Sequence, residues 1–376
     1  MVQVNKERLI NRFIELVKID SETRDEAKFA AYLKSELTKL NVTVKEDNAM
    51  SLIDHQANNL ICTLEGTDSH SHSIFFSSHM DTVTPGKNIN PQITDDYITS
   101  DGTTILGADD KAGIAVIFEL IHLLQENKIH HGDIQFILTV GEESGLAGAK
   151  VIDKSLIDAD FGFVLDSDEA VGNIVVAAPY QTKFTATIHG KSAHAGVAPE
   201  KGISAITTAA KAIAKMKLGR IDGETTANIS YFKGGKKSQT NIVTDYVEIE
   251  GEARSIQKEK LDRVINEIQH HFENTAESFG ARAEIEFREM YPGFSIDPDH
   301  KVVKIAQEAA EQLNFESELL TSGGGSDANI FNSLGFPTVN LSVGYEHIHT
   351  TNERIHIDEL VRLAQLSVEI VKQSFR

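Results

Sequence analysis

Residues 106–140 read LGADDKAGIAVIFELIHLLQENKIHHGDIQFILTV, and this stretch decides the fold class. A Gly-flanked turn with two adjacent carboxylates precedes a predicted helix at 112–125, and an uninterrupted apolar strand follows at 134–140. Further apolar strands are predicted at 42–44, 60–64, 74–78, 161–165 and 339–343. Apolar strands that alternate with helices are typical of a sheet buried on both faces. We therefore expect an α/β fold with a mixed, mostly parallel sheet and helices on both faces.

The pattern changes between 179 and 291. Strands there alternate apolar and polar residues, and two helices are predicted at 203–216 and 258–279, in the order β-α-β-β-α-β. That order is the ferredoxin-like α+β arrangement. A chain of 376 residues is also long enough for about two domains of ~150 residues. We expect one domain made of 1–178 and 292–376, interrupted by an inserted ferredoxin-like lid domain at 179–291.

The charge balance limits the partners of this chain. Thirty-six Lys and Arg against 56 Asp and Glu give a net charge of −20, which repels nucleic acid and anionic membrane surfaces, and the only basic stretch is the short 233–237. No apolar run approaches the ~20 residues that span a bilayer, and the polar segment 1–7 lacks the apolar core of a secretory signal. We expect a cytoplasmic protein without nucleic-acid or membrane partners.

Cysteine usage limits the metal chemistry. Cys62 is the only cysteine, which excludes an internal disulfide and a thiolate-rich metal site. Any metal ion must therefore be held by histidine and carboxylate side chains.

Acidic and imidazole side chains gather at five turns that follow strands or precede a helix, where open α/β sheets bind ligands. They are His79 with Asp81, Asp109 with Asp110, Glu142 with Glu143, Asp166, and His347 with His349. Each group alone has an ordinary interpretation, such as a solvated loop histidine, helix-capping aspartates or exposed glutamates. Five groups together predict a site for divalent cations, which bind imidazoles, terminal carboxylates and a bridging carboxylate.

Two of these groups indicate different roles for neighbouring side chains. The adjacent charges of Glu142 and Glu143 repel each other, so a metal ion must neutralise one or its pKa must rise, which favours one ligand and one general base. The spacing of His79 and Asp81 lets the aspartate orient the imidazole from behind.

The motifs resemble, in order along nearly the whole chain, those of the di-zinc metallopeptidases of the aminoacylase/carboxypeptidase-G family, in particular its peptidase T-like branch. They are His79-x-Asp81, Gly107-Ala108-Asp109-Asp110-Lys111-Ala112-Gly113, Glu142-Glu143, Asp166, Gly190-x-Ser192-Ala193-His194-Ala195-Gly196, Gly324-Gly325-Ser326-Asp327 and His349-Thr350. The resemblance implies two zinc ions, or other divalent cations such as Co or Mn. It assigns their ligands as His79 and Asp166 for one cation, Glu143 and His349 for the other, and Asp109 as the bridge.

The resemblance also assigns supporting and catalytic roles. Asp81 would stand behind His79, and Glu142 would be the general base that takes a proton from a water shared by the two cations. Either His347 or His349 could reach a metal. His349 is preferred because the following Thr350 and Glu353 fit the family pattern.

The implied reaction is hydrolysis of short peptides, such as tripeptides, at the N-terminus. Asp166 stands where carboxypeptidase-like members carry Glu, and the 107–113 string is similar to that of peptidase T. Two alternatives remain at this point: a carboxypeptidase or N-acyl amino acid deacylase on the same metals, and a non-catalytic binding protein on the same scaffold.

Three residues of the lid are expected to bind substrate. The resemblance implies that His194 donates to the oxyanion from the neighbouring subunit of a homodimer formed through the lid. Asn241 and Arg254 are predicted to recognise the peptide's C-terminal carboxylate, which a guanidinium matches with two parallel hydrogen bonds. The ordinary interpretations are a turn residue for His194 and a surface salt bridge for Arg254.

Overall fold

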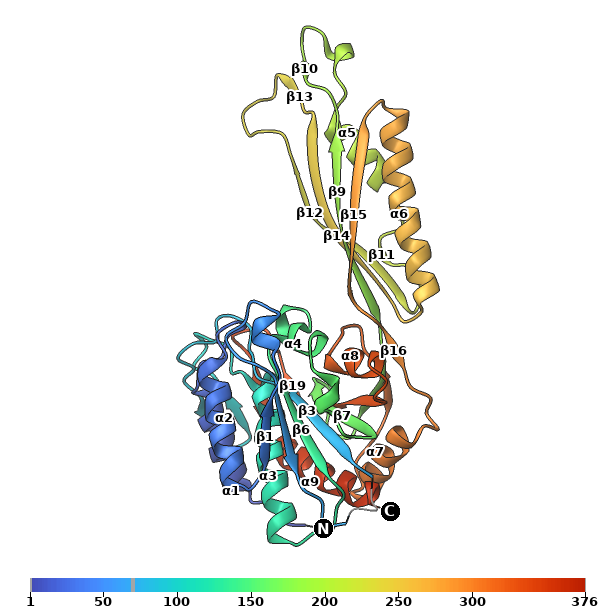
Figure 1. Ribbon diagram of the computed structural model, residues 1–376. Coiled ribbons are helices and arrows are strands. Elements are labelled where there is room, and N and C mark those ends of the chain that lie inside the picture. The colour runs from blue at the N-terminus through green and yellow to red at the C-terminus, as the bar shows by residue number, and fades with distance from the viewer. Residues whose placement is uncertain (1, 69–71, 376) are drawn as a thin grey trace. The chain divides into compact units, whose positions relative to one another are not determined.

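The computed structural model describes residues 2–68 and 72–375 (Figure 1). Met1–Ala177 and Ser295–Arg376 form a larger unit, and Ala178–Phe294 form a smaller one. Among the described residues, none of the helices is both long enough and apolar enough to cross a membrane.

A nine-stranded sheet forms the centre of the larger unit. Its order is β1-β2-β6-β3-β7-β18-β8-β16, with β17 beside β8. The strands are β1 (Thr43–Glu46), β2 (Leu60–Leu64), β3 (Ile74–His79), β6 (Ile134–Thr139), β7 (Phe161–Ser167), β8 (Ile174–Ala178), β16 (Phe294–Ser295), β17 (Leu319–Thr321) and β18 (Thr338–Ser342). The central strands β6, β3, β7 and β18 are parallel, whereas β1, β2 and β8 run antiparallel to neighbours. The predicted mixed, mostly parallel sheet is therefore present.

Helices pack around this sheet (Figure 1). They are α1 (Lys6–Val17), α2 (Ala27–Lys39), α3 (Ala108–Glu126), α4 (Ala147–Lys150), α7 (Lys301–Gln312), α8 (Asp327–Ser333) and α9 (Ile357–Ser374), with the short 3-10 helices η1 (Ala49–Ser51), η2 (Glu142–Ser144) and η3 (Lys154–Leu156). Helix α3 is apolar on nearly all sides because it lies between β3 and β7 of the sheet and the helices α1 and α9. Because α3 is buried along nearly its whole length, its first turn, which carries Asp109, is held in place.

A second, four-stranded sheet joins distant parts of the larger unit. Its order is β19-β20-β5-β4, formed by β4 (Gln92–Ile93), β5 (Tyr97–Thr99), β19 (Tyr345–Glu346) and β20 (Arg354–His356). The antiparallel pairing of β19 with β20 holds the ends of the loop at 347–353. That loop contains both His347 and His349.

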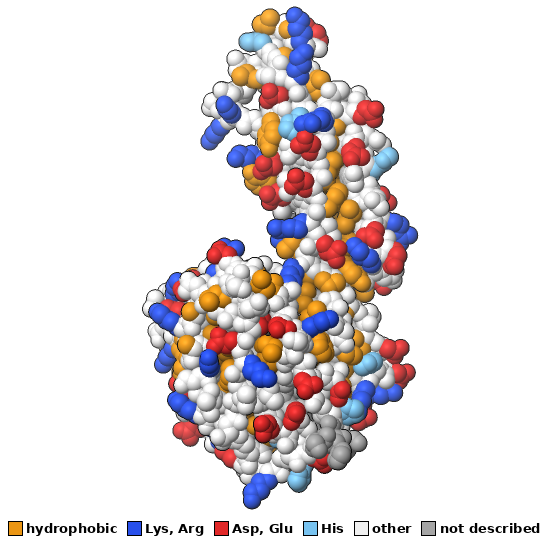
Figure 2. All heavy atoms as spheres, in the orientation of Figure 1, with side chains coloured by type: hydrophobic (Ala, Val, Ile, Leu, Met, Phe, Trp, Pro, Cys, Tyr) orange, Lys and Arg blue, Asp and Glu red, His pale blue; other side chains and the backbone are white. Residues whose placement is uncertain are grey.

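The smaller unit has a five-stranded antiparallel sheet of order β11-β12-β14-β9-β15. Its elements are β9 (Tyr180–His189), β10 (Ala193–His194), η4 (Pro199–Lys201), α5 (Ala205–Ile213), β11 (Gly219–Arg220), β12 (Thr225–Gly234), β13 (Ile242–Val243), β14 (Tyr246–Ser255), α6 (Lys258–Ser278) and β15 (Arg282–Tyr291). The long elements follow in the order β-α-β-β-α-β. Helices α5 and α6 contact each other and cover one face of the sheet. Figure 2 shows acidic and basic side chains intermixed over the visible surface of this unit.

Candidate metal centre

The carboxyl ends of the parallel strands bring the predicted ligands together. His79 is the last residue of β3, Asp166 lies near the end of β7, and Glu142 and Glu143 begin η2 directly after β6. These strands end at the same edge of the sheet because they run parallel. The start of α3 adds Asp109 at this edge.

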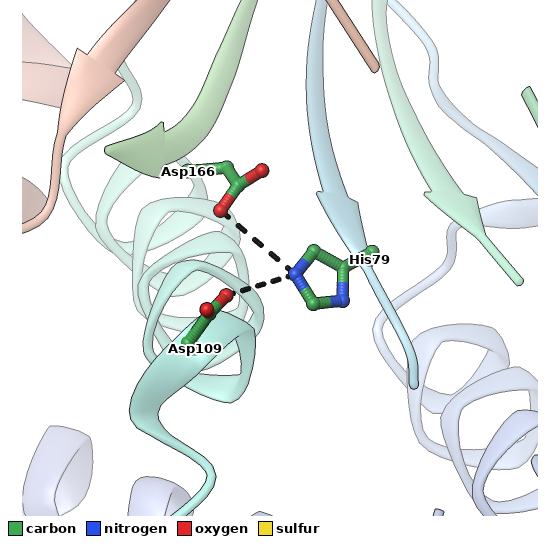
Figure 3. A group of neighbouring side chains, drawn as sticks. All are labelled: His79, Asp109 and Asp166. Atoms are coloured by element: carbon green, nitrogen blue, oxygen red, sulfur yellow. Dashed lines mark hydrogen bonds and ion pairs between the residues drawn. The ribbon is translucent and has the colours of Figure 1, made fainter. Parts of the chain in front are cut away.

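One group of side chains consists of His79, Asp109 and Asp166 (Figure 3). His79 Nε2 lies 2.9 Å from Asp109 Oδ1 and 3.8 Å from Asp166 Oδ1. The other ring nitrogen, Nδ1, lies 2.9 Å from the backbone oxygen of Asp81. The ring is thus held from behind, and Nε2 faces the two carboxylates.

A second group consists of Asp109, Glu143 and His349. His349 Nε2 lies 3.1 Å from Asp109 Oδ2 and 2.8 Å from Glu143 Oε1. The two carboxylate oxygens of Asp109 therefore face two different histidines, one in each group. A carboxylate in this arrangement has the geometry of a bridge between two metal positions.

The charges of this site favour cation binding. Burial and the neighbouring charge of Asp109 raise the pKa of Asp166 well above its usual range, and burial and Asp166 do the same for the pKa of Glu142. The hydrogen bond that His349 makes with the Asp109 carboxylate, together with the nearby Glu143 carboxylate, raises the pKa of His349 to about 10. These shifts are those expected where several carboxylates are buried close together.

The donor set fits divalent metal ions. Burial raises the pKa of Asp109, but the hydrogen bonds with His349 and His79 outweigh it and the net pKa is lowered, so this side chain is a carboxylate. Among the described residues, the buried Glu143 Oε1 accepts no hydrogen bond, although His349 Nε2 lies 2.8 Å away. Two imidazoles and oxygen ligands of this kind suit zinc, cobalt or manganese.

Asp81 attaches to the loop that carries the paired glutamates. Its Oδ1 accepts a hydrogen bond from the backbone N–H of Glu142 at 2.9 Å, and its Oδ2 accepts one from the N–H of Glu143 at 3.2 Å. Because its backbone oxygen also contacts His79, Asp81 connects the histidine of the first group to the glutamates. The sequence motif indicated only the contact with His79.

Glu353 is a supporting residue whose role the sequence did not show. It is 1% exposed, and its carboxylate accepts hydrogen bonds from the backbone N–H groups of Leu106, Gly107 and Asp109 at 2.8, 2.8 and 3.0 Å. Burial raises the pKa of Glu353 to about 7. The side chain thus holds the turn that presents Asp109, from a position 244 residues away in the chain. The acidic residue after the His349 motif was the only available signal.

Replacing Glu353 by Ala is expected to lower the free energy of unfolding by about 2–5 kcal/mol. The reason is that three buried N–H groups lose their acceptor, and each unsatisfied group costs about 1–3 kcal/mol before the structure relaxes. Urea denaturation of the metal-free protein measures the change. Glu346→Ala is the matched control, because its partly exposed carboxylate pairs with Arg354 and contributes at most about 1 kcal/mol. An equal effect of the two substitutions would contradict the role assigned to Glu353.

Two further side chains hold the first group in place. Tyr345 donates a hydrogen bond from its hydroxyl to Asp166 Oδ1 at 2.8 Å. The fully buried Asp110 accepts one from the backbone N–H of His79 at 3.1 Å and another from the hydroxyl of Ser78. Asp110 therefore lies behind the site, although its place in the sequence paired it with Asp109 as a candidate ligand.

The structure separates the two histidines of the 347–353 loop. Of the described residues, His349 belongs to a group of close metal-ligating atoms and His347 does not. Both residues have positive φ angles, 58° for His347 and 61° for His349, so the backbone turns sharply here. That turn directs one of two imidazoles only two residues apart toward Asp109.

The three predicted substrate-binding residues lie in the smaller unit. His194 is exposed at the end of β10, and the backbone N–H of Ala195 donates to the carbonyl of Asn241 at 2.8 Å. Arg254 lies near the end of β14, where its Nε donates to Glu252 Oε1 at 2.8 Å. Strand β14 begins at Tyr246, close in sequence to Asn241, and its extended backbone places Arg254 roughly 26 Å further along. Arg254 and the segment next to Asn241 therefore lie at opposite ends of β14.

Comparison with known proteins shows a family and several similar structures. The sequence model for peptidase family M20/M25/M40 matches residues 75–373. The structure of the aminopeptidase PepT from Bacillus cereus ATCC 10987 is similar with a TM-score of 0.96 and 55% identity, over 99% of this chain and 100% of that chain. A tripeptidase from Staphylococcus aureus has a TM-score of 0.97 and 49% identity over 99% of both chains. Peptidase T of Bacillus subtilis strain 168 is 27% identical over an alignment of 412 positions, which covers 98% of this chain and 98% of that protein.

Proposed function

The chain belongs to peptidase family M20/M25/M40, and from this premise we propose that it is a di-zinc aminopeptidase that removes the N-terminal residue of tripeptides. A metal-dependent aminopeptidase is what the family and the similar aminopeptidase and tripeptidase structures support. The single observation that carries the two-metal proposal is the position of Asp109, whose two oxygens face His79 and His349.

The proposed ligands divide between the two positions around Asp109. His79 and Asp166 would hold one cation, and Glu143 and His349 would hold the other. When bound, the two cations would supply Lewis-acid activation of water and stabilisation of the charge that develops on the peptide carbonyl oxygen.

Glu142 is the proposed general base and acid. One carboxylate oxygen of Glu142 lies within 4.8 Å of a ring nitrogen of His79 and of a carboxylate oxygen of Glu143, so the side chain faces the metal positions. Burial raises its pKa well above the usual range, which suits a carboxylate that accepts a proton from the attacking water and then passes it to the leaving amine. Its backbone N–H, held by Asp81, fixes the point from which the carboxylate reaches the substrate.

A panel of three substrates tests the proposed reaction. The purified, zinc-loaded protein is expected to hydrolyse a free tripeptide and to leave its N-acetylated form and an N-acetyl amino acid intact. Product analysis by mass spectrometry identifies which end is removed. Release of the C-terminal residue would indicate a carboxypeptidase, cleavage of the N-acetyl amino acid a deacylase, and no cleavage at all a binding protein; each result would replace the proposal.

The smaller unit is proposed to act as an inserted lid and dimerisation domain, spanning about 179–291. The support is the family resemblance of the segment around His194 together with the separate hydrophobic core of this unit. The proposed compartment is the cytoplasm, supported by the single cysteine, Cys62, which is buried and free. Arg254 and Asn241 stay candidates for the substrate carboxylate, and Arg254 also has an internal ion pair with Glu252.

His194→Ala is expected to lower turnover by about 10²–10³-fold with zinc content unchanged, because one donor to the oxyanion is lost. Steady-state kinetics and metal analysis measure the two quantities. If His194 acts from the neighbouring subunit, mixing this variant with inactive Glu142→Gln restores up to about half of the sites in each mixed dimer. Activity that stays at the level of the two parents after proven subunit exchange would contradict action across subunits.

A further inference from the structure

Three residues that the proposed chemistry does not use form a connected group beside the loop of Glu142 and Glu143. His55 Nδ1 lies 2.8 Å from Glu26 Oε1, and His55 Nε2 lies 3.3 Å from Ser144 Oγ. The side chain of His55 is 3% exposed and that of Glu26 is fully buried. Burying an imidazole and a carboxylate costs free energy even when they are paired, so their presence here requires a physical reason.

The ring of His55 packs directly on the backbone of Gly141, the residue before Glu142. Gly141 has a φ of 61°, and a Cβ added to it would lie 2.2 Å from His55 Cε1. A side chain at this position is therefore excluded twice, by the backbone conformation and by the imidazole. The position of His55 consequently limits where the loop can begin.

Ser144 connects the other end of the loop to the same ring. Its hydroxyl donates to the carbonyl of Gly141 at 3.0 Å, which closes the loop on itself, and its Oγ is the atom that His55 Nε2 approaches. A serine that contacts a histidine, which in turn contacts a glutamate, is also the arrangement of an activated nucleophile. The hydroxyl of Ser144 donates to the carbonyl of its own loop, however, so the contacts favour a structural role over a nucleophile. We call the contacts of His55 with Glu26, Gly141 and Ser144 the clasp.

The support continues to the turn before α2. Thr23 donates from its hydroxyl to Asp81 Oδ2 at 2.7 Å, and three residues later Glu26 contacts His55. Asp81 in turn accepts the backbone N–H groups of Glu142 and Glu143. The turn at 23–26 therefore supports the loop of Glu142 and Glu143 in two ways, through Asp81 and through His55.

We propose that His55, held by Glu26 and in contact with Gly141 and Ser144, is a positioning residue that sets the location of the Glu142 carboxylate. The inference rests on the proposed function for its effect on rate, but the clasp itself is independent of the reaction. A displacement of a catalytic group by about 1 Å can lower the rate by about 10²-fold. Loss of the imidazole leaves empty space against Gly141 and frees the loop to move by such a distance.

Hydrogen exchange of the metal-free, full-length protein tests the clasp without any assay of activity. The His55→Ala variant is expected to exchange the amides of 141–147 at least about 10-fold faster than the unmodified protein. His131→Ala is the matched control, because His131 is also buried, at 5% exposure, and its Nδ1 contacts the carbonyl of Gly132, which precedes β6 whereas the 141–147 loop follows it. Equal exchange of 141–147 in the two variants would overturn the proposal.

Kinetics of the zinc-loaded enzyme test the consequence for rate. His55→Ala is expected to lower kcat by about 10–100-fold with KM within about 3-fold, and His55→Asn to recover part of kcat because its amide can still donate to Glu26. Ser144→Ala removes only the hydroxyl of a residue that is exposed overall, so this variant is expected to fold even if His55→Ala does not. It is expected to lower kcat about 3–10-fold. An unchanged kcat in folded, zinc-loaded Ser144→Ala and His55→Asn would overturn the role in rate. If the unmodified protein cleaves no peptide, the proposed function fails, and the exchange measurement alone decides on the clasp.

Discussion

Glu142→Gln is expected to lower turnover of a tripeptide by about 10²–10⁴-fold while both metal ions stay bound. Glutamine keeps the size of the side chain but cannot accept a proton from the attacking water. The backbone of residue 142 should not move, because its N–H remains bound to Asp81. Steady-state kinetics, with metal analysis of the same sample, measure the two effects separately.

Glu143→Gln provides the contrast for this experiment. Glu143 Oε1 lies 2.8 Å from His349 Nε2, so its substitution is expected to lower the metal content itself. The two substitutions should therefore have different effects. Glu142→Gln lowers turnover while the metal ions are retained, whereas Glu143→Gln lowers the metal content. Undiminished turnover in Glu142→Gln would exclude it as the base and make Glu143 the first candidate.

Asp109→Ala is expected to abolish binding of both metal ions together, and activity with it. Its Oδ1 faces His79 and its Oδ2 faces His349, so one substitution removes a charged oxygen from each position. The affinity for both ions should fall by more than the ~10–100-fold that loss of an outer-shell partner causes. Elemental analysis after dialysis, with titration of zinc into the metal-free protein, measures the loss.

Asp166→Ala distinguishes a bridge from a single ligand. Asp166 belongs to the group of His79 but not to that of His349, so this variant is expected to keep one zinc ion per chain. Asp101→Ala, which changes an exposed carboxylate outside both groups, should keep two. Two zinc ions per chain in Asp109→Ala would show that the bridging assignment is wrong.

The main elements of the fold could be predicted because apolar periodicity reflects burial. The strand expected at 60–64 has the bounds of β2, and the helix expected at 258–279 corresponds to α6, which ends at 278. The family suggested by the motifs is confirmed by the match over 75–373. The sheet of β19, β20, β5 and β4 was not predicted, because strands of two or three residues carry too little pattern to detect.

The sequence by itself determined which residue types could do chemistry here. A single cysteine excluded a thiolate-rich metal site, and the carboxylates and histidines at strand ends defined the candidate ligands. Strand ends can be located from sequence because the apolar pattern that marks a buried strand is a local property of the chain.

Only the tertiary structure decided which candidates meet. Asp109 and His349 are 240 residues apart, and the backbone turn of the 347–353 loop brings His349 rather than His347 to the carboxylate. Glu353 holds the turn of Asp109, and His55 packs on Gly141, through contacts that neither local sequence indicates. The physical reason is that such contacts depend on how whole sheets and loops pack in space, whereas periodicity and capping act over a few residues.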